Sequence, residues 1–257
     1  MAACPPLIRT LLTTLPYGWL RRLGDLVYPA TCPGCGILTG GHAGFCPNCW
    51  TEIRFIERPY CEVLGVPFSY DPGEGMVCAE AIADPPVFDR LRSVAIHEGP
   101  VRHLVHDLKY RDRTDLSAMM ALWMLRASDG FVAGCDAVVP VPLHRWRFAS
   151  RKFNQSAELA RHLARLSDRP FLPRTLARVK NTARQVGLTA KGREDNVRAA
   201  FQIMPGHEPD VAGKRIVLVD DVYTTGATVT SAARALKKAG ALEVTVLTFA
   251  MAISGPI

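Results

Sequence analysis

The stretch Lys214-Arg-Ile-Val-Leu-Val-Asp-Asp-Val-Tyr-Thr-Thr-Gly-Ala-Thr228 decides the fold that the sequence predicts. Residues 216–219 form a short, continuous apolar run with β-branched side chains, which is typical of a strand buried inside a parallel sheet. Asp220 and Asp221 follow at the carboxyl end of this strand. Open α/β sheets bind their ligands beyond that end of the strands. We therefore expect a binding site around the two aspartates.

The residues that follow predict an anion-binding turn at the start of a helix. Apolar residues recur at helical spacing from Val229 to Leu236, so the turn leads into a helix N-terminus. Free N–H groups and the positive end of the helix dipole attract an anion there. Glycine lets the backbone approach that anion, and threonine hydroxyls can donate to it. The predicted turn comprises Thr224, Thr225, Gly226, Ala227 and Thr228.

Two carboxylates beside a phosphate would repel it unless they hold something else. Carboxylates accept hydrogen bonds from vicinal hydroxyls, such as those of a ribose, and can hold Mg²⁺ through water. The stretch therefore predicts a site for a sugar phosphate. The alternatives are a Walker B strand or a plain strand–turn–helix. Walker B requires a Walker A partner, and the nearest candidate, Gly206 to Lys214, has the wrong spacing and precedes the strand.

Residues 219–228 resemble the PRPP-binding motif of type I phosphoribosyltransferases. In that family the two acidic residues bind the ribose hydroxyls, and the loop of the TTGAT type binds the 5′-phosphate. The resemblance implies that Asp220 and Asp221 are the catalytic pair, that residues 224–228 bind PRPP, and that Mg²⁺ accompanies it.

Length and composition predict a folded protein with one good-sized domain and a small module. The chain has 257 residues, 48% hydrophobic and 21% charged. Its net charge of +7 favours anionic partners such as phosphates or nucleic acid. We expect no membrane span, because no apolar run approaches the required length. Residues 6–15 form a short amphipathic piece, packed on the protein itself or in peripheral contact with a membrane.

Four of the eight cysteines form two C-x-x-C knuckles, a strong signal for one tetrahedral zinc site. Disulfides or a redox C-x-x-C are the alternatives. The lack of a secretory signal argues against the first, and the second knuckle argues against the other. Four protein ligands leave no open position on the metal, so the expected role is structural. Gly34 and Gly36 are expected to allow the tight turn. The predicted ligands are Cys32, Cys35, Cys46 and Cys49.

Outside the central stretch, the sequence resembles the ComF (ComFC) family of competence-associated proteins. The resemblance is carried by the knuckles, by residues 108–112, by the segment Arg151-x-Phe-Asn-Gln155 and by residues 176–196. ComF proteins commonly carry a second pair of knuckles. Here Cys61 and Cys78 remain, but Leu64 and Ala81 stand where cysteines are expected, so apolar packing is predicted in place of a second metal.

Other apolar runs predict the rest of an α/β fold. Strands are expected at 91–96, 136–142, 201–204 and 242–249, and helices at 100–110 and 155–166. In the second helix, Leu159, Leu163 and Leu166 are expected to face inward. The βαβ order predicts a parallel, doubly wound sheet. The resemblance adds a hood, for which 100–112 is the candidate. The expected division is 1–30, an amphipathic segment; 31–84, the zinc ribbon with a degenerate second knuckle; and 85–257, the phosphoribosyltransferase-like domain.

Two basic segments are further candidates for contacts with phosphate. The loop before the helix at 155–166 contains Arg151 and Lys152, where cations suit a pyrophosphate or a nucleic-acid backbone. Residues 176–193 are polar, glycine-containing and without a clear period, which fits a mobile loop that closes over substrate or a solvated connector. Arg184 in this segment is a third candidate PRPP ligand.

The sequence therefore predicts two functions from different classes. The first is a cytoplasmic, PRPP-dependent phosphoribosyltransferase with a zinc ribbon, using PRPP or a related ribose 5-phosphate. The resemblance associates it with DNA uptake and natural transformation. The second is a non-catalytic accessory protein that binds single-stranded nucleic acid, such as DNA, beside the competence helicase machinery. It would bind PRPP as a signal or not at all. Trp50, next to the knuckle, would either stack on a base or anchor the ribbon.

Overall fold

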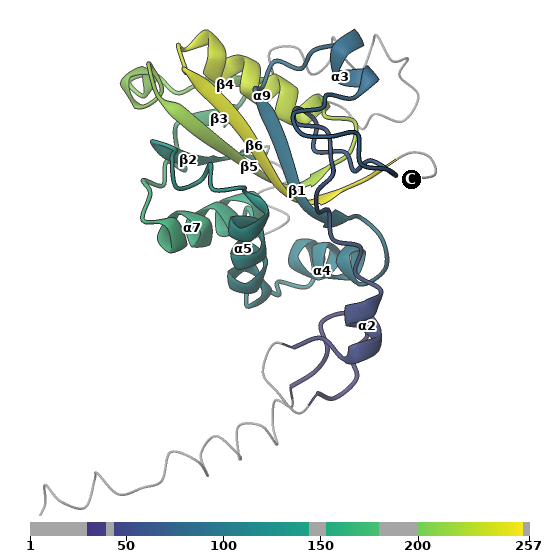
Figure 1. The fold of residues 1–257 in the computed structure, drawn as a ribbon. Helices are drawn as coiled ribbons and strands as arrows, with labels where there is room; N and C mark the ends of the chain where they lie inside the picture. The colour runs from purple at the N-terminus through teal and green to yellow at the C-terminus, as the bar shows by residue number, and fades with distance from the viewer. Residues whose placement is uncertain (1–29, 40–43, 144–152, 180–199, 254–257) are drawn as a thin grey trace, which may run out of the picture.

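A computed structural model describes residues 30–39, 44–143, 153–179 and 200–253 (Figure 1). Its centre is a four-stranded, fully parallel sheet with the order β1-β6-β5-β2. The strands are β1 (Arg90–Ile96), β2 (Ala137–Pro140), β5 (Arg215–Tyr223) and β6 (Glu243–Met251). The parallel sheet predicted from the apolar runs is confirmed, because those runs are buried on both faces.

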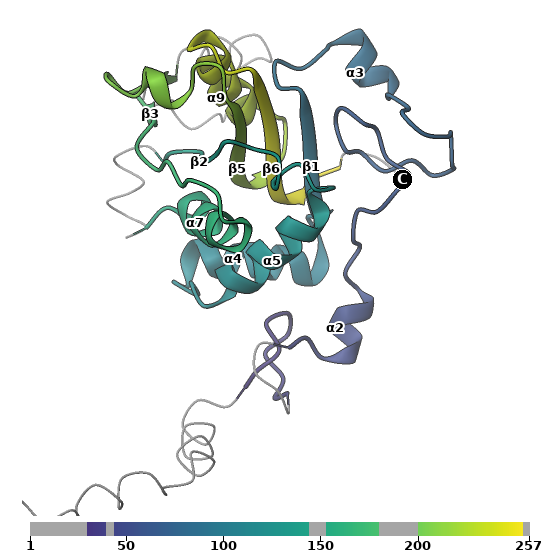
Figure 2. The ribbon, with the colours of Figure 1, turned by 60° about the vertical axis from the view of Figure 1, so that its left-hand side comes forward.

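Helices cover both faces of this sheet, as predicted for a doubly wound fold (Figure 2). One face carries α4 (Gly99–Tyr110), α5 (Leu116–Ala127) and α7 (Gln155–Ser167). The other carries α9 (Ala227–Lys238). Side chains of β5 alternate between the two cores: Val217 and Val219 pack with the three helices, while Ile216 and Leu218 pack with α9. The central strand therefore joins the two halves of the core.

The helix faces follow the predicted spacing with one exception. In α4 and α9 the periodic apolar residues are buried, as they are at Leu159 and Leu163 of α7. Leu166 was expected to face inward, but it is 47% exposed. It lies in the last turn of α7, where Leu163 and Ala164 form the buried face.

The segment 176–193 begins with structure that the sequence did not predict. Leu176–Arg178 form β3, which pairs antiparallel with β4 (Phe201–Ile203) in a separate two-stranded sheet that packs on α9. Three residues are too few to show the hydrophobic period of a strand, and for this reason the sequence predicted a loop here. Residues 180–193, where the closing loop was predicted, lie outside the described residues.

Strand β1 is buried on both faces along almost its whole length. Arg92 is only 3% exposed because acidic partners surround its guanidinium group. Its Nε donates to Asp129 Oδ2 over 3.1 Å and its Nη2 to Glu62 Oε2 over 2.7 Å. The ring of Tyr60 lies within cation–π distance of the guanidinium groups of Arg92 and Arg58.

The N-terminal part lies along this strand. Phe55 pairs antiparallel with Ala95, and Leu91 donates its N–H to Val63 O over 2.8 Å. Short helices α2 (Pro47–Thr51) and α3 (Ala79–Ala83) mark two small hairpin modules. The module with α2 stands away from the sheet below α4, whereas the one with α3 lies beside it at the opposite end (Figures 1 and 2). A 3₁₀ turn (Glu208–Asp210) precedes β5.

Candidate functional site

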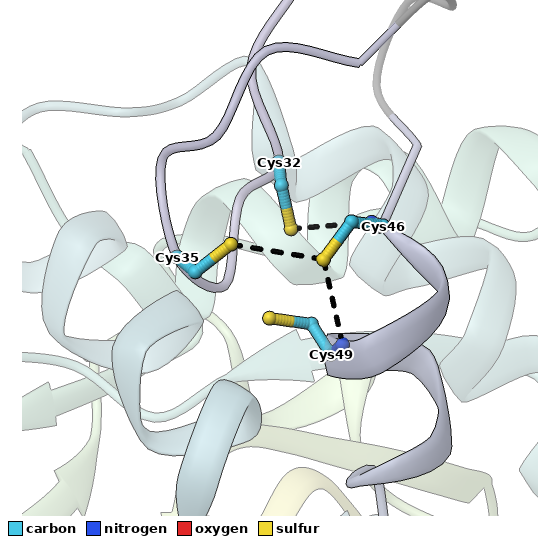
Figure 3. Close-up of side chains that lie close together, drawn as sticks. All are labelled: Cys32, Cys35, Cys46 and Cys49. Atoms are coloured by element: carbon cyan, nitrogen blue, oxygen red, sulfur yellow. Dashed lines mark hydrogen bonds between the residues drawn. The ribbon is translucent and has the colours of Figure 1, made fainter.

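The four predicted cysteine ligands converge on one point (Figure 3). The sulfur atoms of Cys32, Cys35, Cys46 and Cys49 all lie within 4.8 Å of one another. The sulfurs of Cys35 and Cys46 are 3.7 Å apart. Four thiols on two knuckles fit a tetrahedral Zn²⁺ with no open coordination position. This geometry supports the predicted structural zinc.

Backbone amides prepare one of these sulfurs for ionisation. The N–H groups of Gly34 and Cys46 point to Cys32 Sγ over 3.4 and 3.3 Å. Burial opposes ionisation of Cys32, but these hydrogen bonds prevail and lower its pKa to about 6. Zinc binds thiolates, so a lowered pKa reduces the proton competition that the metal must overcome.

The two glycines of the first knuckle have different roles. Gly36 adopts a φ of +78°, as expected for the tight turn, and donates to Cys32 O over 2.8 Å. Gly34 has no positive φ. It is required by space instead, because a Cβ there would lie 2.9 Å from Cys49 Sγ and 3.1 Å from Pro100 Cβ. The carbonyl oxygen of Gly34 also lies 2.7 Å from His103 Nδ1, so α4 supports the knuckle.

The second module repeats the first without its full ligand set. Cys32 donates its N–H to Ile37 O over 2.7 Å, and Cys61 likewise donates to Val66 O over 2.8 Å. Cys46 and Cys78 cap the following helices with nearly equal dihedral angles. Leu64 and Ala81, at the positions of the missing cysteines, are buried in the core shared with α9. Apolar packing therefore occupies these two positions, and within the described ranges only the first module gathers three or more potential metal ligands.

Trp50 lies in an aromatic cluster that joins the zinc module to the sheet. Its ring centroid is 5.5 Å from that of Phe55 and 5.8 Å from that of Trp123. Trp123 in turn stacks against Phe45 and the buried Phe249. These contacts favour the anchoring interpretation. Half of Trp50 nevertheless remains exposed, beside a cavity of about 340 Å³.

Asp220 and Asp221 lie inside β5, not after it as predicted, because β6 runs alongside to Met251 and continues the ladder. They still lie beyond the end of β2, which stops at Pro140 opposite Val219. Asp220 Oδ1 accepts from Ser156 Oγ over 2.8 Å and from the N–H of Asp221 over 2.9 Å. Burial and the charge of Asp221 raise the pKa of Asp220 to about 7.

Asp221 has a different partner. Its Oδ1 lies 2.9 Å from Lys109 Nζ, at the last turn of α4. Thus α4, the segment expected to form the hood, packs on the sheet and brings its C-terminal end to the aspartates. His97, which follows β1 directly, shares this environment: burial and the charge of Lys109 lower its pKa, while Asp221 acts in the opposite direction.

The turn after β5 contains the residues predicted to bind an anion and leads directly into α9. Thr224 and Thr225 are exposed, and α9 begins at Ala227. Gly226 has a φ of +73°, which favours glycine, and a Cβ there would lie 2.7 Å from Tyr223 Oη. Burial raises the pKa of Tyr223, and Glu80 and Cys78 of the second module act in the same direction. Tyr223 and Cys78 also pack against the same hydrophobic core.

Sequence reasoning missed three residues of the site: Lys109, Ser156 and His97. The position of His97 directly after a parallel strand was an available signal, because such ends meet at one edge of the sheet. Lys109 and Ser156 could not be found this way, since only folding brings them to the aspartates. Three predicted PRPP ligands, Arg151, Lys152 and Arg184, lie outside the described residues.

The donor set at β5 fits Mg²⁺ held through water. Carboxylate oxygens are the ligands that this ion prefers, and it usually keeps several waters. Asp220 and Asp221 supply such oxygens beside the turn at residues 224–228. No described helix is long and apolar enough to cross a membrane.

Comparisons with known proteins match both parts of the chain. Residues 23–82 match the double zinc ribbon domain, and residues 157–256 match the phosphoribosyl transferase domain. The DNA utilization protein YhgH of Salmonella typhimurium is 34% identical over 86% of this chain and 96% of its own length. Competence protein F of Haemophilus influenzae is 30% identical over 79% and 88%, and competence protein ComFC of Bacillus subtilis 27% identical over 76% and 78%.

Proposed function

The chain belongs to the ComF family of competence-associated proteins, and from this premise we propose that it is a PRPP-dependent phosphoribosyltransferase. The observation that carries the proposal is the succession, on one strand and turn, of Asp220, Asp221 and the positive-φ Gly226 at the start of α9. The two carboxylates can accept hydrogen bonds from the ribose hydroxyls, and the adjacent turn can hold the 5′-phosphate. Together they match the two ends of a ribose 5-phosphate.

In this proposal each part of PRPP meets a different group. The backbone N–H groups and hydroxyls of residues 224–228 hold the 5′-phosphate. Asp220 and Asp221 accept hydrogen bonds from the ribose hydroxyls and orient the ring. The anomeric carbon then loses pyrophosphate and gains a nucleophile through an oxocarbenium-like state. Mg²⁺ bound with PRPP would offset charge on the leaving pyrophosphate.

Cations from the two basic segments would act on the same leaving group. Arg151 and Lys152 follow β2 in the sequence, and Arg184 lies between β3 and β4. We assign them to PRPP from this sequence position and from the charge that the leaving group carries.

The names of the relatives support a role for this chain in handling DNA. YhgH is named for DNA utilization, and the other two relatives for competence. We propose that the protein acts in the cytoplasm during DNA uptake, together with the competence machinery.

A second candidate is a non-catalytic protein that binds single-stranded DNA. The net charge of +7 favours it, together with the half-exposed Trp50. Such binding would be weak and would fall steeply with salt, because released counterions drive it. Titration of an oligothymidine at 50 and 200 mM salt tests this account, and equal affinities at the two salts would rule it out.

The decisive experiment for the first candidate measures both binding and product. Calorimetry should show that Asp220→Asn and Asp221→Asn weaken PRPP about ten- to a hundredfold, because each loses a charged hydrogen bond to the ribose (roughly 1.5–3 kcal/mol). A simple phosphate, which has no ribose hydroxyls, should be affected less. Asp168→Asn, the same change at the exposed C-cap of α7, is the control. Labelled PRPP offered to a panel of acceptors then separates transfer from mere binding. Wild-type protein that binds neither PRPP nor ribose 5-phosphate would refute the proposal.

A further inference from the structure

A lysine from outside the PRPP-binding motif holds one of the two aspartates. Lys109 Nζ lies 2.9 Å from Asp221 Oδ1, and the side chains are 21% and 12% exposed. Lys109 stands on α4, whose apolar face of Val101, Leu104, Val105 and Leu108 is buried against the helices and the sheet. The backbone that carries the lysine is therefore fixed.

The contact between Lys109 and Asp221 matters because the proposed ligand and the two aspartates are all negatively charged. Two carboxylates stand beside a turn suited to phosphate, and PRPP carries charge on both its 5′-phosphate and its pyrophosphate. Asp220 has its own partners, Ser156 and the N–H of Asp221, and both are neutral groups. The ammonium group of Lys109 is thus the cation that the described residues place in contact with the pair.

We propose that Lys109 is a positioning residue for PRPP, an inference that rests on the proposed function. By binding Oδ1, it holds the Asp221 carboxylate so that Oδ2, for which the described contacts show no partner, accepts a ribose hydroxyl. Its positive charge also offsets one carboxylate, so that a highly charged ligand can enter a site with two acids.

An ordinary structural role would have different consequences. Lysine in the last turn of a helix interacts favourably with the helix dipole, and Lys109 occupies that position in α4. If this were its whole function, removal of its charge would lower stability slightly and leave ligand affinity unchanged.

The test uses three variants of the full chain, with calorimetric titration of PRPP and of ribose 5-phosphate and a thermal melt of each protein. Lys109→Gln keeps a polar side chain without charge, and Lys109→Arg restores the charge. Lys237→Gln is the matched control, because Lys237 Nζ binds Asp89 Oδ2 over 2.6 Å far along α9 from the turn.

We expect Lys109→Gln to weaken PRPP about ten- to a hundredfold and the less charged ribose 5-phosphate by a smaller factor. Lys109→Arg should recover most of the PRPP affinity, and Lys237→Gln should bind as wild type does. The inference fails if wild type binds PRPP and Lys109→Gln binds it equally well, or if arginine gives no recovery. Wild type that binds no PRPP would instead remove the proposed function itself.

Discussion

The N–H of Cys78 points to the sulfur of Cys61 over 3.2 Å, in the same geometry that links Cys46 to Cys32 over 3.3 Å. The second module has two of the four thiols that a zinc site of this kind uses, yet its backbone forms the same knuckle hydrogen bonds. Gly65, like Gly36, retains a positive φ in the turn. The second module therefore has the backbone conformation of a metal-binding knuckle but only two of the four cysteine ligands.

Restoring the two missing thiols should restore the metal. We expect elemental analysis to find one zinc per wild-type chain and two in the double variant Leu64→Cys/Ala81→Cys, because four thiolates would then meet on a preformed backbone. Leu64→Cys alone, with three thiols, is the control and should stay at one. Two zincs in the wild type would show that Leu64 and Ala81 had not disabled the site.

Loss of one ligand from the first module should release its metal. Cys32→Ser is expected to lose zinc and unfold residues 31–52, because metal binding and folding are coupled in small ribbons. Limited proteolysis would detect the unfolding as new cleavage in this segment. Cys135→Ser, a buried cysteine outside the cluster, should keep both the metal and the resistance to protease.

Gly226 should tolerate substitution less well than a glycine of similar conformation elsewhere. Gly226→Ala and Gly206→Ala both place a side chain at positive φ, at a cost of about 1 kcal/mol. Only the first meets a neighbour, since Tyr223 Oη lies 2.7 Å from the new Cβ while Gly206 has open space. We expect a further loss of about 1–3 kcal/mol for Gly226→Ala in urea unfolding, and weaker binding of both PRPP and ribose 5-phosphate. Equal stabilities of the two variants would contradict this account.

The raised pKa of Asp220 predicts a dependence of stability on pH. This pKa is about 7 in the folded protein against an ordinary value of 3.8, so the folded state binds more protons between these values. Stability therefore falls as pH rises from about 4 to 7 and then levels off. Asp220→Asn should match wild type near pH 4 and exceed it above pH 7, by at most about 4 kcal/mol. Urea unfolding across this range checks the sign, and a pH-independent difference would refute it.

Local sequence predicted the parallel sheet because buried strands and their flanking glycines leave clear patterns. The zinc ligands and the turn at 224–228 were equally visible, since each lies within a few residues. Helix α5 was not predicted, because its apolar residues extend around most of the helix and hide the period. Lys109, Ser156 and the partners of Arg92 are brought together only by packing, across separations that no local pattern encodes.

The burial of the second module determines how the protein can be dissected. Cys61, Leu64 and Ala81 pack in the same core as Leu91 and Val229. Glu62 of this module also forms an ion pair with Arg92, the buried arginine of β1. A chain cut at residue 85 would carry the complete PRPP motif, yet it would expose an apolar edge and leave a buried guanidinium group short of a partner. An isolated C-terminal fragment that aggregates or fails to bind PRPP would therefore say nothing about the intact protein. In chimaeras that combine the first module of one relative with the remainder of another, the junction should lie before residue 53, where the first module ends.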